Sequence, residues 1–160
     1  MISDEHPTPL PVEQLRDGIN ALEQTVITLL EGEVTLATLE TALHSHDALN
    51  DQLAAFDTLD SSALAALQRI EHFITLQAGQ YYQAAEATLQ GPENNRFISL
   101  FARQLLALEG IGPATARQLF QAGIFTPDAF YALTPQAIEA LELPPSTLAR
   151  LLTLQAQKPN

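Results

Sequence analysis

The sequence contains no cysteine and no tryptophan, and Lys158 is its only lysine. Without cysteine the chain has no disulfide, no thiolate zinc site and no thiol nucleophile, which is compatible with a reducing cytoplasm. A lysine positioned to form a Schiff base is also missing, because Lys158 stands at the third position from the end of the sequence. These absences exclude several classes of enzyme and favour a protein without catalytic activity.

Long apolar runs and clusters of β-branched residues are missing too. No apolar run approaches the ~18–20 residues that a membrane helix needs, so we expect no membrane segment. The acidic start from Met1 to Pro7 lacks the apolar core of a secretory signal. Leu, Ala, Gln and Glu are frequent instead. We therefore expect an all-α, cytoplasmic protein.

Basic residues are scarce, and the acidic residues are unevenly distributed. The formal net charge is −12. Residues 1–92 hold fourteen acidic and two basic residues, whereas residues 93–160 hold five of each. Proteins that bind nucleic-acid backbones usually carry a basic footprint, because phosphate neutralisation supplies much of the affinity. The acidic half therefore faces away from nucleic acid, docks a basic partner, or serves solubility alone.

Helical spacing organises the first part of the chain. The prolines in residues 1–11 predict a flexible lead-in, and residues 12–91 are expected to form an acidic antiparallel helical bundle. Apolar residues of the first helix recur at alternating spacings of three and four, which is typical of a helix seam. That seam either packs inside the bundle or forms a homodimer interface. Its members are Val12, Leu15, Ile19, Leu22, Val26 and Leu29.

Two further helices complete the predicted bundle. Thr35 offers an N-cap for the second helix, whose apolar face runs from Leu36 to Phe56. The turn-like residues 57–62, with Asp57 and Asp60, offer caps for a third helix that is broken by Gly91-Pro92. A fourth helix is expected to run from Pro92 to Leu108 and to be shared between the bundle and a domain over residues 92–157.

The most informative segment follows this fourth helix. Gly110 comes after a run of helix-forming residues and suits the left-handed position at a helix end. Ile111 is expected to plug between two helices, and Gly112 leaves room for another backbone. Pro113 suits the first position of the next helix, since its missing N–H costs nothing there. The pattern predicts a helix, a tight hairpin and a second helix.

The start of the second helix of this hairpin is a candidate anion site. The free N–H groups of its first turn and the positive end of its dipole favour a phosphate. A purely structural helical hairpin remains the alternative, because the same residues occur in proteins that bind nothing. The candidate residues for contact with a nucleic-acid backbone are Gly110, Ile111, Gly112, Pro113, Ala114, Thr115 and Arg117.

The segment from Leu105 to Phe120, with Gly110-Ile111-Gly112-Pro113 at its centre, resembles the helix-hairpin-helix motif. Downstream, Thr126-Pro127 and Thr134-Pro135 offer two more helix starts, and Leu143-Pro144-Pro145-Ser146 takes the place of the hairpin. Residues 100–157 therefore resemble a compact tandem helix-hairpin-helix domain. This region is similar to the amino-terminal domain of archaeal recombinases and, in outline, to the carboxy-terminal domain of the bacterial RNA polymerase alpha subunit.

This resemblance implies a module that grips nucleic-acid backbones without reading sequence. One position departs from the DNA-binding members, in which the residue after the hairpin proline is commonly Lys or Arg. Here that residue is Ala114, and the nearest cation is Arg117, with Arg103 and Arg150 more distant. The acidic first half resembles, more loosely, the small helical flagellar export chaperones.

Other candidates for chemistry are weak. His44 and His46 are two residues apart, so on a helix they point in different directions and make a poor metal site with Asp47. We expect a solvated polar face there. Of the adjacent tyrosines, Tyr81 is expected in the core and Tyr82 at its boundary. The sequence predicts no catalytic residue, metal site or cofactor.

The sequence as a whole favours a non-enzymatic adaptor. Its hairpin would contact a nucleic-acid backbone, with DNA bound irrespective of sequence, and its acidic bundle would engage a protein partner. The alternatives are a purely protein–protein interaction module and a secretion-type chaperone, neither of which binds nucleic acid.

Overall fold

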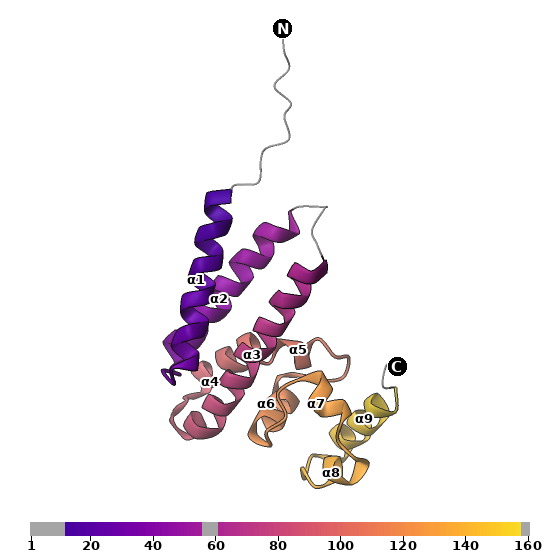
Figure 1. Ribbon diagram of the computed structural model, residues 1–160. Coiled ribbons are helices and arrows are strands. Elements are labelled where there is room, and N and C mark those ends of the chain that lie inside the picture. Colours follow the sequence, from indigo (N-terminus) through magenta and orange to yellow (C-terminus); the bar gives the residue numbers. More distant parts are fainter. Residues whose placement is uncertain (1–11, 56–60, 158–160) are drawn as a thin grey trace. The chain divides into compact units, whose positions relative to one another are not determined.

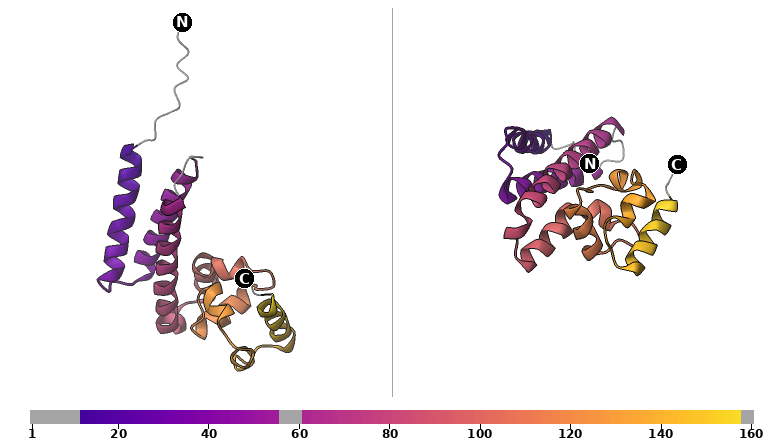
Figure 2. Two further views of the ribbon diagram at one scale, coloured as in Figure 1. Left: turned by 45° about the vertical axis from the view of Figure 1, so that its right-hand side comes forward. Right: turned by 90° about the horizontal axis from the view of Figure 1, so that it is seen from below.

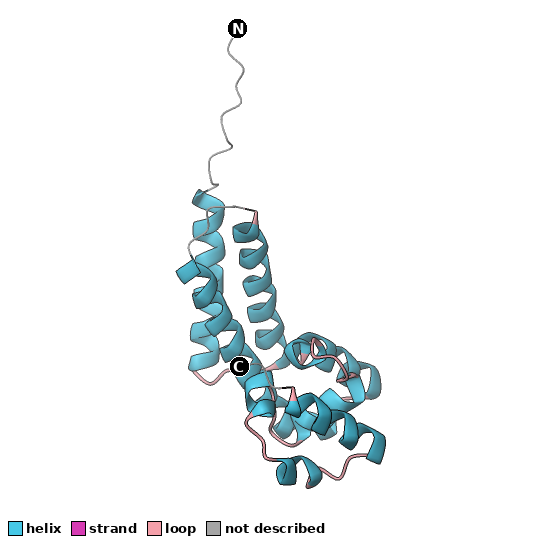
Figure 3. Cartoon of the chain, turned by 90° about the vertical axis from the view of Figure 1, so that its right-hand side faces the viewer, coloured by secondary structure: helices cyan, strands magenta, loops and turns pink. Residues whose placement is uncertain are grey.

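The computed structural model describes residues 12–55 and 61–157, and every regular element in these ranges is a helix (Figure 3). The all-α prediction is therefore confirmed. The predicted lead-in 1–11, the apolar position Phe56, the caps Asp57 and Asp60, and Lys158 lie outside the described residues. In chain order the elements are α1 (Val12–Leu30), α2 (Leu36–Ala54), α3 (Ser61–Ala85), the 3-10 turn η1 (Glu86–Thr88), α4 (Gly91–Phe101), α5 (Arg103–Leu106), α6 (Pro113–Gln121), α7 (Pro127–Tyr131), α8 (Pro135–Glu139) and α9 (Pro145–Ala156) (Figure 1).

The chain divides into two compact units, and the division falls inside α3. The first unit extends to Ile74, and the second begins at Thr75. The C-terminal part of α3 thus belongs to the same unit as the helices that follow it. A fragment meant to isolate the second unit must therefore begin before Thr75.

The first unit contains α1, α2 and the N-terminal part of α3. α1 packs along α2, and Gly32, with φ +90°, forms the turn between them. Thr35 caps α2 as predicted, since its hydroxyl accepts the Thr38 N–H while the Thr38 hydroxyl accepts the Thr35 N–H. One cluster of the core contains a buried leucine from each helix, and four half-buried residues pack around it. The core leucines are Leu22, Leu49 and Leu67, and the surrounding residues are Leu15, Val26, Leu53 and Ile70.

Two predictions for the first unit need correction. Ile19, a member of the predicted seam, is 52% exposed. His46 is buried rather than solvated, whereas His44 is exposed as predicted. The His46 Nε2 atom lies 3.0 Å from the Leu67 carbonyl oxygen, and Nδ1 lies 3.1 Å from Asp47 Oδ1. A buried imidazole is tolerated where both nitrogens have partners, and the Leu67 partner comes from a helix distant in sequence.

The second unit has an aromatic core around Tyr82. Its ring stacks on Phe97 with centroids 5.3 Å apart and meets the edge of Phe120 at 5.8 Å. The buried Tyr82 hydroxyl donates to Asn94 Oδ1 at 3.0 Å. Tyr82 is therefore the core residue and Tyr81 the half-buried one, the reverse of the prediction. The reason is that α4 supplies both an aromatic face and a hydrogen-bond partner to Tyr82.

Gly79 sets the distance between α3 and the segment that follows α6. A Cβ atom at Gly79 would lie 2.3 Å from the Phe125 ring, which is far inside van der Waals contact. Gly79 itself is buried. The ring therefore packs directly on the helix backbone, and only glycine permits this approach.

Two helix ends differ from the predicted ones. α3 ends at Ala85 and is followed by η1, before Gly91-Pro92 is reached. The single helix expected from Pro92 to Leu108 is interrupted at Ala102, whose φ of −99° and ψ of 17° are not helical, and α5 ends at Leu106. Neither proline nor glycine marks the break at Ala102, so the sequence pattern did not reveal it.

Candidate nucleic-acid interface

The hairpin between α5 and α6 has the predicted backbone. Gly110 has φ +95°, a conformation that other residues rarely adopt. The Ile111 N–H donates to the Leu108 carbonyl at 3.2 Å, which closes the turn. Gly112 is extended, with φ −96° and ψ 179°, and is the N-cap of α6. The Ala116 N–H then donates to the Gly112 carbonyl at 2.9 Å, so α6 begins at Pro113.

The structure divides the predicted contact residues into buried and accessible ones. Ile111 and Thr115 are 5% and 7% exposed, so they hold the hairpin rather than form its surface. Pro113 and Ala114 are exposed, and a Cβ atom at Gly112 would meet nothing within 4 Å. At the start of α6 the accessible residues are therefore Gly112, Pro113 and Ala114.

The N-terminus of α6 is an electropositive feature of this surface. Pro113 carries no N–H, and the amides of Ala114 and Thr115 precede that of Ala116, the first N–H to donate within the helix. These amides and the helix dipole favour an anion. Because no side chain projects from Gly112, an anion can approach closely.

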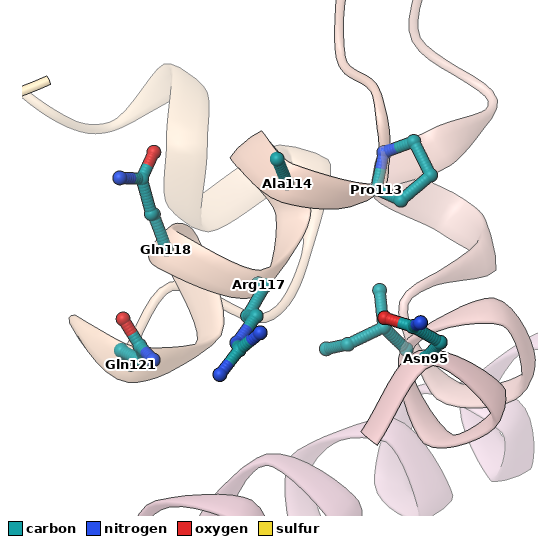
Figure 4. A pocket seen from close by; sticks show the side chains of 7 residues that line it. Asn95, Pro113, Ala114, Arg117, Gln118 and Gln121 are labelled. Carbon is teal, nitrogen blue, oxygen red and sulfur yellow. The ribbon is translucent and has the colours of Figure 1, made fainter. Parts of the chain in front are cut away.

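A groove of about 500 Å³ lies beside the hairpin, between α4 and α6. Asn95 and Ile98 form one wall, and the α6 residues from Pro113 to Gln121 form the other (Figure 4). In the view of Figure 4 the exposed Arg117 side chain extends from α6 into this groove. The far end of α6 is held by hydrogen bonds, because the Gln121 side chain bonds the Glu86 carboxylate and its carbonyl accepts from Gln83 at 3.3 Å.

A second cation, Arg150 of α9, lies against the hairpin. Its Nη1 atom is 3.4 Å from the Gly110 carbonyl oxygen. A Cβ atom at Gly110 would lie 3.1 Å from Arg150 Cδ, so the stem of this side chain covers the glycine. Arg150 is thus closer to the hairpin than its separation of forty residues from Gly110 led us to expect. The second half of the domain therefore supplies a positive charge at the turn of the first hairpin.

The second hairpin repeats the backbone of the first. Glu142 has φ +55°, Leu143 is 7% exposed, and Pro144 is the extended N-cap of α9. The Leu148 N–H donates to the Pro144 carbonyl at 2.9 Å, matching the bond from Ala116 to Gly112. The residues equivalent to 110–113 are therefore 142–145, one position earlier than the predicted alignment, which is wrong. The predicted alignment was placed on the pair Pro144-Pro145. The positive φ of Glu142 and the burial of Leu143 define the correct one.

The predicted caps of α7 and α8 are present. Thr126 and Thr134 accept from the Ala129 and Ala137 amides at 3.2 Å and 3.1 Å.

Within the described residues of both units, no group of three or more His, Cys, Asp or Glu side chains is placed to hold a metal ion. No helix in these residues combines the length and apolar character needed to cross a membrane.

Comparison with known proteins agrees with this geometry. The family described as a SAM-like helix-hairpin-helix tandem matches residues 102–158, which include α5 to α9 and both hairpins. No curated protein and no solved structure matched the chain. The finer similarity to the recombinase domain and the chaperone-like character of the first half stay predictions. Residues 102–158 form a tandem helix-hairpin-helix domain.

Proposed function

We propose that this protein is a non-enzymatic adaptor that contacts the backbone of nucleic acid, most simply DNA, through its first hairpin. Its acidic first unit engages a protein partner. The observation that supports the nucleic-acid contact is the open N-terminus of α6. Arg117 lies in the groove beside this helix, and Arg150 lies against Gly110 in the hairpin turn. Such an arrangement suits a phosphate group.

The geometry suggests how a phosphate is held. Its oxygens accept hydrogen bonds from the Ala114 and Thr115 amides, while Arg117 contributes charge from the groove and Arg150 from the hairpin turn. The accessible residues Gly112, Pro113 and Ala114 carry no side-chain donor or acceptor that could read a base edge. Binding of this kind positions the backbone and is independent of base sequence.

Two arginines make a weak and salt-sensitive site. Neutralising two phosphates of duplex DNA predicts a slope of log affinity against log salt of about −1.8. The first unit opposes binding, since residues 1–74 hold thirteen acidic and two basic residues. An adaptor that is brought to nucleic acid by a protein partner tolerates this low intrinsic affinity.

The second candidate is a protein-interaction module or secretion-type chaperone without a nucleic-acid role. It is favoured by Ala114 at the position commonly held by a cation and by the acidic charge of the first unit. The two candidates differ in one measurable property, which is binding to DNA at low salt.

The test is a titration of the full-length protein against labelled single-stranded, duplex and branched DNA at low and physiological salt. The proposed function predicts sequence-independent binding that weakens as salt rises. Absence of binding to all three probes at low salt would contradict it and leave the protein-interaction module. A fragment used in parallel for the second unit must retain α3 from before Thr75, since Tyr82 contributes to its core.

A further inference from the structure

The first unit has an apolar groove of about 440 Å³ along its three helices. Its lining residues come from α1, α2 and the N-terminal part of α3, the helices coloured from indigo to magenta in Figure 2. Every one of them is Ile, Leu, Val or Ala except Glu23. The groove runs over this core cluster, because Leu22, Leu49 and Leu67 belong to both.

Large apolar side chains that line the groove are exposed to solvent. Ile19 is 52% and Ile27 is 37% exposed, and both line it. Val26 and Ile70 pack against the core cluster and are only partly buried. Contiguous exposed apolar surface of this kind marks an interaction site more often than isolated exposed residues do.

The shape of the groove matches one additional helix. On α1 the lining residues follow the spacing i, i+3, i+4, i+7 and i+8 from Ile19 to Ile27, so they form a straight ridge roughly 12 Å long. On α3 the wall runs from Ala63 to Ile70, and its small residues Ala63 and Ala66 leave room beside the backbone. Grooves between helices accept amphipathic helices whose apolar anchors recur at i, i+3 or i+4, and i+7.

The charge of the first unit indicates the polar face of the occupant. Residues 1–74 hold thirteen acidic and two basic residues, and the one charged group in the groove wall is the Glu23 carboxylate. A second copy of this chain, itself at −12, would be repelled on close approach. A helix rich in Lys and Arg would be attracted, because complementary charge both steers association and disfavours wrong partners.

We propose that the groove between α1 and α3 is a docking site for one amphipathic helix of a partner protein, with apolar anchors in the groove and a basic polar face. This inference deepens the protein-binding half of the proposed function and rests on it. Glu23 pairs with a Lys or Arg at the edge of the anchor row. The hairpin of the second unit is not part of this site.

The test uses a displayed library of random peptides of about fourteen residues, or four helical turns, selected on the full-length protein. The expected peptides carry apolar residues at i, i+3 or i+4, and i+7, together with Lys or Arg. A synthetic representative then binds in fluorescence anisotropy and weakens about tenfold or more with the Ile19→Asp/Ile27→Asp double variant. Both positions are exposed, so circular dichroism should show unchanged helicity.

Leu30→Asp is the matched control, because Leu30 is 67% exposed on the same helix but does not line the groove. Its peptide affinity should match that of the wild type. Failure to select any patterned peptide, selection of acidic helices, or equal weakening by Leu30→Asp would overturn the proposal. A wild-type dimer that the double variant converts to monomer would assign the groove to a second copy instead.

DNA binding of the same samples separates this inference from the hairpin assignment. Both α1 variants should bind DNA nearly as tightly as the wild type, since neither touches the hairpin and one or two added carboxylates change the charge of the acidic first unit little. If peptides bind the groove but the protein does not bind DNA, the docking site stands and only the nucleic-acid half of the proposed function is contradicted. DNA binding without groove peptides would overturn the docking site alone.

Discussion

Gly110 and Glu142 hold the same backbone position in two successive hairpins, with φ of +95° and +55°. Each is followed by a buried apolar residue, an extended N-cap and a proline at the first position of a helix. The tandem domain is thus an internal repeat in which only the first copy has glycine at the left-handed position. That position costs a residue with a Cβ atom roughly 1–2 kcal/mol.

Replacing Glu142 by glycine should therefore stabilise the protein. We expect Glu142→Gly to raise the free energy of unfolding by about 0.5–1 kcal/mol, because relief of the left-handed conformation exceeds the added freedom of the unfolded chain. Urea unfolding measures this change. Glu142→Ala removes the same charge but keeps the Cβ atom, so a matching gain in that control would show that charge, and not backbone conformation, is responsible.

The contact between Gly79 and Phe125 predicts that a methyl group added at Gly79 destabilises the protein. Gly79→Ala should lower the free energy of unfolding by about 1–3 kcal/mol, since the ring or the helix must move. Gly91→Ala is the control, because a Cβ atom there meets nothing within 4 Å. Thermal unfolding followed by circular dichroism compares the two. Equal stability of the two variants would mean that Phe125 does not pack on the α3 backbone.

The hydroxyl of Tyr82 supplies a hydrogen bond to the buried side chain of Asn94. Tyr82→Phe keeps the ring between Phe97 and Phe120 but leaves the buried Asn94 side chain without this donor. We expect a loss of about 1–3 kcal/mol in unfolding free energy. Tyr131→Phe, at a half-buried position, should change stability by less than about 0.5 kcal/mol. Chemical denaturation of both variants decides whether the hydrogen bond contributes as inferred.

The two arginines at the hairpin should contribute to DNA binding through their positive charge. Arg117→Gln and Arg150→Gln are each expected to weaken DNA binding roughly threefold to tenfold at low salt and to reduce the salt slope by about 1, with no change in sequence preference. Anisotropy titrations across salt concentrations give both quantities. Arg16→Gln in the first unit is the control for lost positive charge, and an effect of equal size there would argue against a local site.

Much of the second unit could be predicted because its signals are local. The left-handed position of Gly110, Pro113 at the first position of α6, and the caps Thr126 and Thr134 each depend on a few neighbouring residues. The features that sequence reasoning missed depend on partners far along the chain. Arg150 reaches Gly110 from forty residues away, and Gly79 meets Phe125 across the core.

Other errors had the same physical origin. His46 is buried because the Leu67 carbonyl accepts its hydrogen bond, and Tyr82 is buried because α4 supplies Phe97 and Asn94. The spacing of residues near His46 and Tyr82 in the sequence does not reveal these partners. The alignment of the second hairpin failed because its left-handed residue is Glu142, and no glycine marks the position.

We propose that the N-terminus of α6 is the site of contact with the nucleic-acid backbone. Gly112 offers a clean test, because its φ of −96° suits any residue and an added Cβ atom meets nothing within 4 Å. Gly112→Gln and Gly112→Glu add side chains of nearly equal size and differ in charge. Both variants should keep the helicity of the wild type in far-ultraviolet circular dichroism.

The decisive measurement is the affinity of these two variants for labelled duplex DNA at low salt, beside that of the wild type. We expect Gly112→Gln to retain measurable binding and Gly112→Glu to abolish it, since a carboxylate would compete with phosphate for the amides of α6. Wild-type affinity in Gly112→Glu would mean that the N-terminus of α6 does not contact DNA and that the hairpin is a packing element.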